Sequence, residues 1–154
     1  MRRWIPLALV LTLIGLCVGC TKYSFMPMHK KIVGVWGYEK VVHRPGLLKN
    51  KINITREFEH WELHFRENGS VEAYNLKDGS DKIGQWYLDE YRSTYVDEDG
   101  STNMESEYIL SFNLRDARGK EENYVWKLGT VTAKRLRAYE DFGKESRHYV
   151  LYRK

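Results

Sequence analysis

The stretch HWELHFRENGSVEAYNL, residues 60–76, decides the fold of this chain. In its first half Trp61, Leu63 and Phe65 alternate with polar and charged residues, and this period of two is typical of a β-strand with one buried face. Residues 67–70, ENGS, predict a tight hairpin turn, because Asn-Gly readily takes the positive φ angles of a type I′ turn. The stretch is therefore predicted to form a β-hairpin with one apolar face.

The same alternation continues along the chain, with short turns between the segments. It recurs in KIGQWYLDEYRSTYV (82–96), MESEYILSFNL (104–114), NYVWKLGTVTAKRLRAYE (123–140) and RHYVLYRK (147–154). We count eight or nine strands in sequence order and find no convincing helix of ten or more residues. Strands of this kind must pair as a sandwich or close on themselves. Because sequential hairpins favour closure, we predict an all-β fold, a single antiparallel up-and-down β-barrel over residues 32–154.

The N-terminal segment has the features of a secretory signal peptide. Arg2 and Arg3 precede an almost purely apolar run of 16 residues, Trp4 to Gly19. This run is shorter than the roughly 20 residues that a helix needs to cross a bilayer. We predict a signal peptide over residues 1–19, followed by a tether over residues 20–31. The alternative is a non-cleaved N-terminal anchor.

Both cysteines of the chain stand in CVGC, residues 17–20, at the end of this segment. Val18, Gly19 and Cys20 resemble the lipobox of bacterial lipoproteins, with Cys17 where leucine is usual. The resemblance implies that Cys20 becomes the first residue of the mature protein and carries fatty-acyl chains such as palmitate, which hold it on a membrane. Thr21 after the lipidated cysteine implies the outer membrane of a bacterial cell envelope, facing the periplasm.

Charge and cysteine content limit the possible functions. The formal net charge is +4 for the whole chain, and without the two signal-peptide arginines it is +2. A chain of this charge is not a strong electrostatic partner for nucleic acid, so we expect none. After processing only the lipidated Cys20 remains, which leaves neither an internal disulfide nor a cysteine nucleophile.

A second resemblance concerns the barrel itself. Residues 34–36, Gly-Val-Trp, match the G-x-W of the first strand of lipocalin and calycin barrels, and IGQWYLD at 83–89 resembles the later strands of lipocalin-like lipoprotein domains. The resemblance implies that Trp36 packs under an arginine from near the end of the chain, either Arg147 or Arg153. We assign this structural role, which closes the barrel, to Trp36 and Arg153.

The interior of the predicted barrel contains many aromatic residues. An eight-stranded barrel is just wide enough to be filled by its own side chains or to hold one small molecule. We expect a largely filled interior, with a pocket for an apolar ligand as the alternative. The candidate lumen residues are Trp36, Trp61, Phe65, Trp86, Tyr108, Phe112, Tyr124 and Trp126.

Two polar groupings suggest metal sites, but each has a simpler explanation. His60, Glu62 and His64 share one strand face at the H-x-H spacing of some metal sites, yet this is also the pattern of a solvated outer face. The acidic residues around 97–105 lack the residue order of an EF-hand loop. No nucleophile elbow or ordered triad is visible. We therefore expect no metal, no cofactor and no catalytic residue, and a protein that is not an enzyme.

Three functions remain. We place first a membrane-anchored, protein-binding accessory subunit of an outer-membrane or secretion assembly. Its support is the short tether, the expected filled lumen and the 11 tyrosines, a residue type favoured at interfaces. Outward tyrosines such as Tyr87, Tyr139 and Tyr152 would strengthen this function if they cluster on one wall of the barrel. The second function is a carrier of a small apolar ligand, with the loop 44–56 and its residues Leu47, Leu48 and Ile52 as a lid. The third is an enzyme, or an inhibitor of a wall-degrading enzyme that would present the loop 97–103 to its target.

Overall fold

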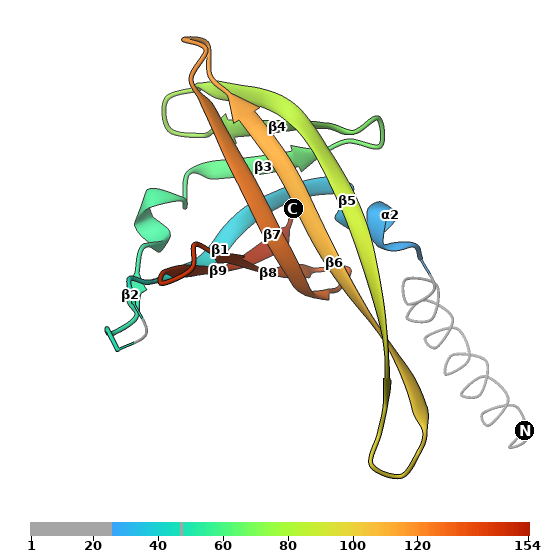
Figure 1. Ribbon diagram of the computed structural model, residues 1–154. Helices are drawn as coiled ribbons and strands as arrows, with labels where there is room; N and C mark the ends of the chain where they lie inside the picture. The colour runs from blue at the N-terminus through green and yellow to red at the C-terminus, as the bar shows by residue number, and fades with distance from the viewer. Residues whose placement is uncertain (1–25, 47) are drawn as a thin grey trace, which may run out of the picture.

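The computed structural model describes residues 26–46 and 48–154, and this part of the chain folds into β-strands with very little helix (Figure 1). The elements are α2 (Met28–Ile32), β1 (Gly34–Arg44), β2 (Ile52–Asn53), the 3-10 turn η1 (Thr55–Glu57), β3 (Trp61–Phe65), β4 (Ser70–Asn75), β5 (Asp81–Val96), β6 (Thr102–Arg115), β7 (Glu121–Val131), β8 (Arg135–Asp141) and β9 (Ser146–Arg153). The signal peptide and Cys20 lie outside the described residues. The predicted all-β fold is confirmed.

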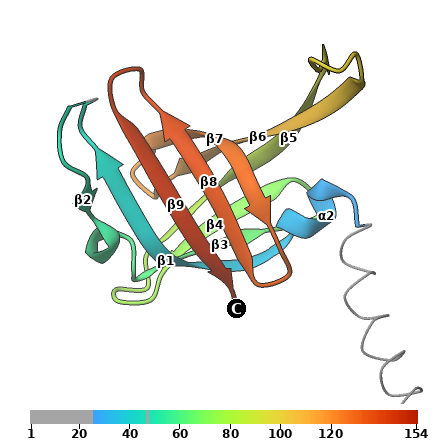
Figure 2. The same cartoon turned by 90° about the horizontal axis from the view of Figure 1, so that it is seen from below.

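Eight of the strands close into an antiparallel barrel. The pairing order is β1-β3-β4-β5-β6-β7-β8-β9, and β9 then pairs with β1. Sequential strands are therefore neighbours, as the short turns predict, and Figure 2 shows β1, β9 and β8 side by side. The short β2 pairs with β1 where the ladder between β1 and β3 has ended, at Val42 and His43. The up-and-down topology predicted from the sequence is confirmed.

One face of each strand is buried in the barrel, and aromatic rings dominate this core. Phe112 stacks on Tyr124 with ring centroids 4.7 Å apart, and its edge meets Trp126 at 4.9 Å. Trp126 in turn stacks on Tyr149 at 4.6 Å. Burying large side chains of this kind is the main favourable contribution to folding, because each removes 150–250 Å² of mostly apolar surface from water.

The hairpin turn at residues 67–70 forms, but it is not of type I′. Gly69 has a φ of +82°, and within the described residues no non-glycine residue has a positive φ. Arg66 N–H donates to Ser70 O (3.0 Å) and Gly69 N–H to Arg66 O (3.1 Å), the pattern of a type I turn followed by a glycine bulge. The Asn68 side chain explains the difference: its Oδ1 accepts from both the N–H and the hydroxyl of Ser70.

The barrel is closed at the end next to α2. Trp36 is fully buried there, and its Nε1 donates to the carbonyl of Ile32 (2.7 Å). Arg153 lies over the Trp36 ring at 4.6 Å and donates to the carbonyls of Val33 (2.9 Å) and Lys31. At Gly34, an added Cβ would lie 2.7 Å from the Arg153 guanidinium, so the glycine lets the arginine approach. Residues 28–31 of the predicted tether form most of α2.

Strands β5 and β6 continue beyond the barrel as a long two-stranded ribbon (Figure 1). The ladder between β4 and β5 ends at Gln85, and that between β6 and β7 ends at Tyr108. Beyond these points β5 extends past β4, and β6 extends past β7. We call residues 87–107 the arm; in it β5 and β6 stay paired with each other as far as Val96 and Thr102. The arm leaves the barrel at the closed end, where β3 ends and β4 begins.

Candidate functional site

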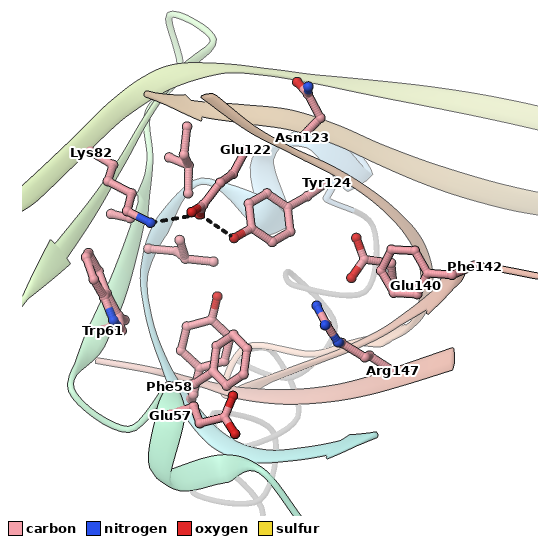
Figure 3. Close-up of a pocket in the computed structure, with 14 residues that line it drawn as sticks. Glu57, Phe58, Trp61, Lys82, Glu122, Asn123, Tyr124, Glu140, Phe142 and Arg147 are labelled. Carbon is pink, nitrogen blue, oxygen red and sulfur yellow. Dashed lines mark hydrogen bonds and ion pairs between the residues drawn. The ribbon is translucent and has the colours of Figure 1, made fainter. Parts of the chain in front are cut away.

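A cavity of about 490 Å³ opens at the end of the barrel opposite α2. Its walls come from the starts of β3, β5, β7 and β9 and from the ends of β4, β6 and β8, which all lie at this end (Figure 3). The lumen is thus filled by aromatic rings near α2 and hollow at the other end. The lining residues are Tyr38, Glu57, Phe58, Trp61, Leu63, Ala73, Lys82, Leu114, Glu122, Asn123, Tyr124, Glu140, Phe142 and Arg147.

Glu140 and Arg147 form the first polar group of the cavity. Glu140 is only 4% exposed, and the Tyr149 hydroxyl donates to its carboxylate at 2.6 Å. Burial raises the pKa of Glu140, although the Tyr149 hydrogen bond and the charge of Arg147 oppose the shift. The Arg147 Nε is buried and has no hydrogen-bond partner within the described residues. This pair therefore keeps unused hydrogen-bonding capacity beside the cavity.

A second polar group, on β5 and β7, is internally paired. Lys82 Nζ lies 2.7 Å from the Glu122 carboxylate, which also accepts from the Tyr124 hydroxyl at 3.0 Å (Figure 3). The Lys82 hydrogen bond lowers the pKa of Glu122. Lys82 also lies 5.0 Å from the centroid of the Trp61 ring, within cation–π range. This group holds the rim of the cavity in place.

Aromatic rings from β1, β3 and the residue after η1 supply the apolar wall. Phe58 lies 5.2 Å from Tyr38 and 6.1 Å from Tyr149, measured between ring centroids. Its position is fixed by Thr55 in η1, whose hydroxyl accepts from Val41 N–H at 2.9 Å. The cavity is therefore amphipathic, with rings on one side and charged groups from β5, β7, β8 and β9 on the other.

The candidate lumen residues have different positions relative to this cavity. Trp61 and Tyr124 line it. Four other candidates pack against one another in the filled part of the lumen, nearer the closed end: Phe65, Trp86, Phe112 and Trp126. Tyr108 lies at the root of the arm, where its hydroxyl donates to Glu90 at 3.2 Å.

None of the described residues of the loop 44–56 lines the cavity. Leu48 and Ile52 are exposed and do not line it, and Leu47 lies outside the described residues. Two residues that do line the cavity, Glu57 and Phe58, come directly after this loop in the sequence. The apolar contact expected from the loop is thus made by Phe58.

The two polar groupings considered as metal sites are engaged in local contacts. His60 lies 3.5 Å from Glu59, and His64 lies 3.3 Å from Glu62, which also contacts Lys154. At the arm tip, Asp99 accepts from the backbone N–H of Ser101. Among the described residues no three His, Cys, Asp or Glu side chains gather as metal ligands would.

Sequence reasoning missed the five charged residues of the site, and Glu57 was not considered at all. Lys82, Glu122 and Glu140 were not considered, and Arg147 was considered only as a partner of Trp36. A signal was available, because in a strand alternate residues share a face. Glu140 shares its face with Leu136 and Ala138, both fully buried, and so had to point inward.

Neither helix of the described part of the chain has the length and hydropathy needed to span a membrane. In comparisons with protein-family models, with curated proteins and with solved structures, no match to this chain was found.

Proposed function

We propose that the barrel is a non-enzymatic binding protein for a small amphipathic molecule, held in the cavity at its open end. The single observation that carries the proposal is this cavity of about 490 Å³, open at one end of a barrel that is closed at the other. Its volume is within the range of about 300–1,000 Å³ typical of small-molecule sites.

The lining indicates the chemistry of the ligand. An apolar or aromatic body would pack against Tyr38, Phe58 and Trp61, and a polar group would reach Arg147 and Glu140. A purely apolar ligand would remove charged groups from water without replacing their hydrogen bonds, which is costly. We therefore prefer an amphipathic ligand to the apolar one expected from the sequence. Because two cationic and three acidic side chains line the cavity, a neutral or zwitterionic ligand suits it best.

The proposed setting is the bacterial cell envelope. We propose that the chain is a lipocalin-like lipoprotein, anchored through acyl chains on Cys20 in the outer membrane and facing the periplasm. The support for this setting is the apolar run and the CVGC stretch of residues 1–20, together with the eight-stranded antiparallel barrel. Because α2 leads into the closed end, a tether there would leave the cavity facing away from the membrane.

The test fills the cavity without changing the surface. Ala73 lines the cavity and is buried, so Ala73→Phe places a ring inside it, whereas Ala117→Phe adds the same ring to an exposed turn. Each full-length variant is purified from its native cells, and its bound small molecules are extracted and quantified by mass spectrometry per mole of protein.

We expect one amphipathic compound to be enriched with the wild type and with Ala117→Phe, and to fall at least about tenfold with Ala73→Phe, equivalent to about 1.4 kcal/mol in binding free energy. Thermal melting followed by circular dichroism shows whether Ala73→Phe is folded. A folded Ala73→Phe variant that carries the same compound as the wild type would contradict the proposal.

A further inference from the structure

We propose that the arm, residues 87–107, is a docking element for a basic surface of a partner protein. This inference is independent of the ligand proposed above, because the arm leaves the barrel at the closed end, away from the cavity. It rests on the unpartnered strands, on a row of exposed tyrosines and on the charge of the arm.

The arm is not needed to complete the barrel. Two-stranded hairpins without further packing are marginally stable in water, so strands of this length are not explained by stability alone. Over residues 91–107 the outer backbone edges of both strands are unpaired in the described structure. Among residues 26–46 and 48–154, an ion pair ties the arm to the barrel only at its root, where Lys127 of β7 lies 2.9 Å from Glu107.

One face of the arm carries a row of tyrosines. Tyr87, Tyr91 and Tyr95 are four residues apart on β5 and therefore share a face, with exposed fractions of 61%, 61% and 48%. Tyrosines are enriched among the residues that contribute most to protein–protein binding. The outward tyrosines named from the sequence, Tyr87, Tyr139 and Tyr152, do not cluster on one wall of the barrel. Tyr139 and Tyr152 lie on β8 and β9, which β6 and β7 separate from β5.

The charge of the arm identifies the kind of partner. Residues 87–107 contain seven acidic residues and one basic residue, Arg92, a formal −6 within a chain of formal +4. Arg92 is already paired with Glu90 at 2.9 Å. Asp89, Glu98 and Glu105 are exposed and have no ion pair in the described part of the chain. A field of one sign steers partners of the opposite sign, and arginines of such a partner also stack well on tyrosine rings.

The experiment places a photo-crosslinker on the tyrosine row. In the full-length protein in its native cells, Tyr91 is replaced by p-benzoylphenylalanine, and a control protein carries the crosslinker at Tyr139, which is exposed on β8, away from the arm. After irradiation, crosslinked peptides are mapped by mass spectrometry. We expect position 91, and not position 139, to crosslink to another protein within a segment of net positive charge.

Charge reversal then tests the chemistry of the contact. Glu98→Lys with Glu105→Lys reverses two exposed arm carboxylates, and Glu67→Lys with Asp81→Lys makes the same change in net charge on the barrel. We expect the first pair to reduce the crosslink from position 91 at least tenfold and the second pair to leave it nearly unchanged, with both variants melting like the wild type.

The proposal is overturned if position 91 yields no crosslink, or crosslinks only to a second copy of this chain. It is also overturned if the mapped segment is not basic, or if both variants give the wild-type yield.

Discussion

The two ends of the barrel combine the same residue types but use them differently. At the closed end Arg153 lies over Trp36 and donates to backbone carbonyls of residues that lead into the barrel. At the open end Lys82 lies beside the Trp61 ring, while Arg147 lines the cavity with its guanidinium 5.2 Å from the Phe142 ring. The difference lies in the surrounding space: an arginine engaged by backbone seals one end, and one beside a cavity is available to a ligand.

The sharpest test of this comparison removes one tryptophan from each end. Trp36→Ala deletes a fully buried ring and its hydrogen bond to Ile32, and should lower the free energy of unfolding by about 3–5 kcal/mol. Trp61 is partly exposed on the cavity wall, so Trp61→Ala should cost about 1 kcal/mol. Urea unfolding measures both values. Equal losses would show that the two ends do not differ in this way.

The two arginines of β9 should separate stability from binding, with a smaller effect. Arg153→Ala removes the hydrogen bonds that the guanidinium donates to the carbonyls of Lys31 and Val33 and should cost about 2 kcal/mol. Arg147→Ala removes the cation beside buried Glu140 and should cost about 1 kcal/mol, but unlike Arg153→Ala it should also reduce the bound small molecule, as measured by extraction and mass spectrometry. Retention of the compound by Arg147→Ala would remove this residue from the proposed site.

The smallest expected effect is a pH dependence of the open end. Burial raises the pKa of Glu140 in the folded protein, so its contribution to stability is present below its unfolded pKa and is lost as pH rises through the folded pKa. Glu140→Gln keeps an acceptor for Tyr149 and removes this loss. At pH 8 the free energy of unfolding of the variant, measured by urea unfolding, should therefore exceed that of the wild type by about 1 kcal/mol or less. At pH 4 the two proteins should be equally stable.

Glu122 supplies the matched control, because its pKa shift has the opposite sign. The Lys82 hydrogen bond lowers the pKa of Glu122, so its contribution is present above its unfolded pKa and is lost as pH falls through the folded pKa. Glu122→Gln should therefore be less stable than the wild type at pH 8 and should approach it at acidic pH. If both variants shift in the same direction at pH 8, the assignment of the two carboxylates is wrong.

The fold was predictable because it depends on local patterns. Alternation in segments such as 60–76 indicates which residues share a face, and short turns make sequential strands neighbours. The turn at 67–70 was predictable in place but not in type, since its geometry depends on the Asn68 side chain bonding to Ser70. The length of β5 was visible in the alternation, but nothing local indicated that β4 stops pairing with it at Gln85.

The site was less predictable, because alternation gives the face of a residue and not its depth along the barrel. Phe112 and Trp61 both point inward, yet Phe112 meets rings from other strands while Trp61 borders the cavity. Whether an inward ring fills or lines a lumen depends on residues across the barrel that are distant in sequence. Arg147 and Arg153 illustrate the same limit, since they share one face of β9 but lie at opposite ends of the barrel.

The pairing of β1 with β9 has a consequence for how the protein is made. Trp36 is opposite Arg153 in this ladder, so the first strand of the barrel can be joined on its second side only once β9 is present. Closing such a long loop carries an entropic cost, and folds dominated by contacts of this kind fold in milliseconds to seconds. Until then β1 has neighbours on one side only, and the sheet closes into a barrel when residues 146–153 pair with β1.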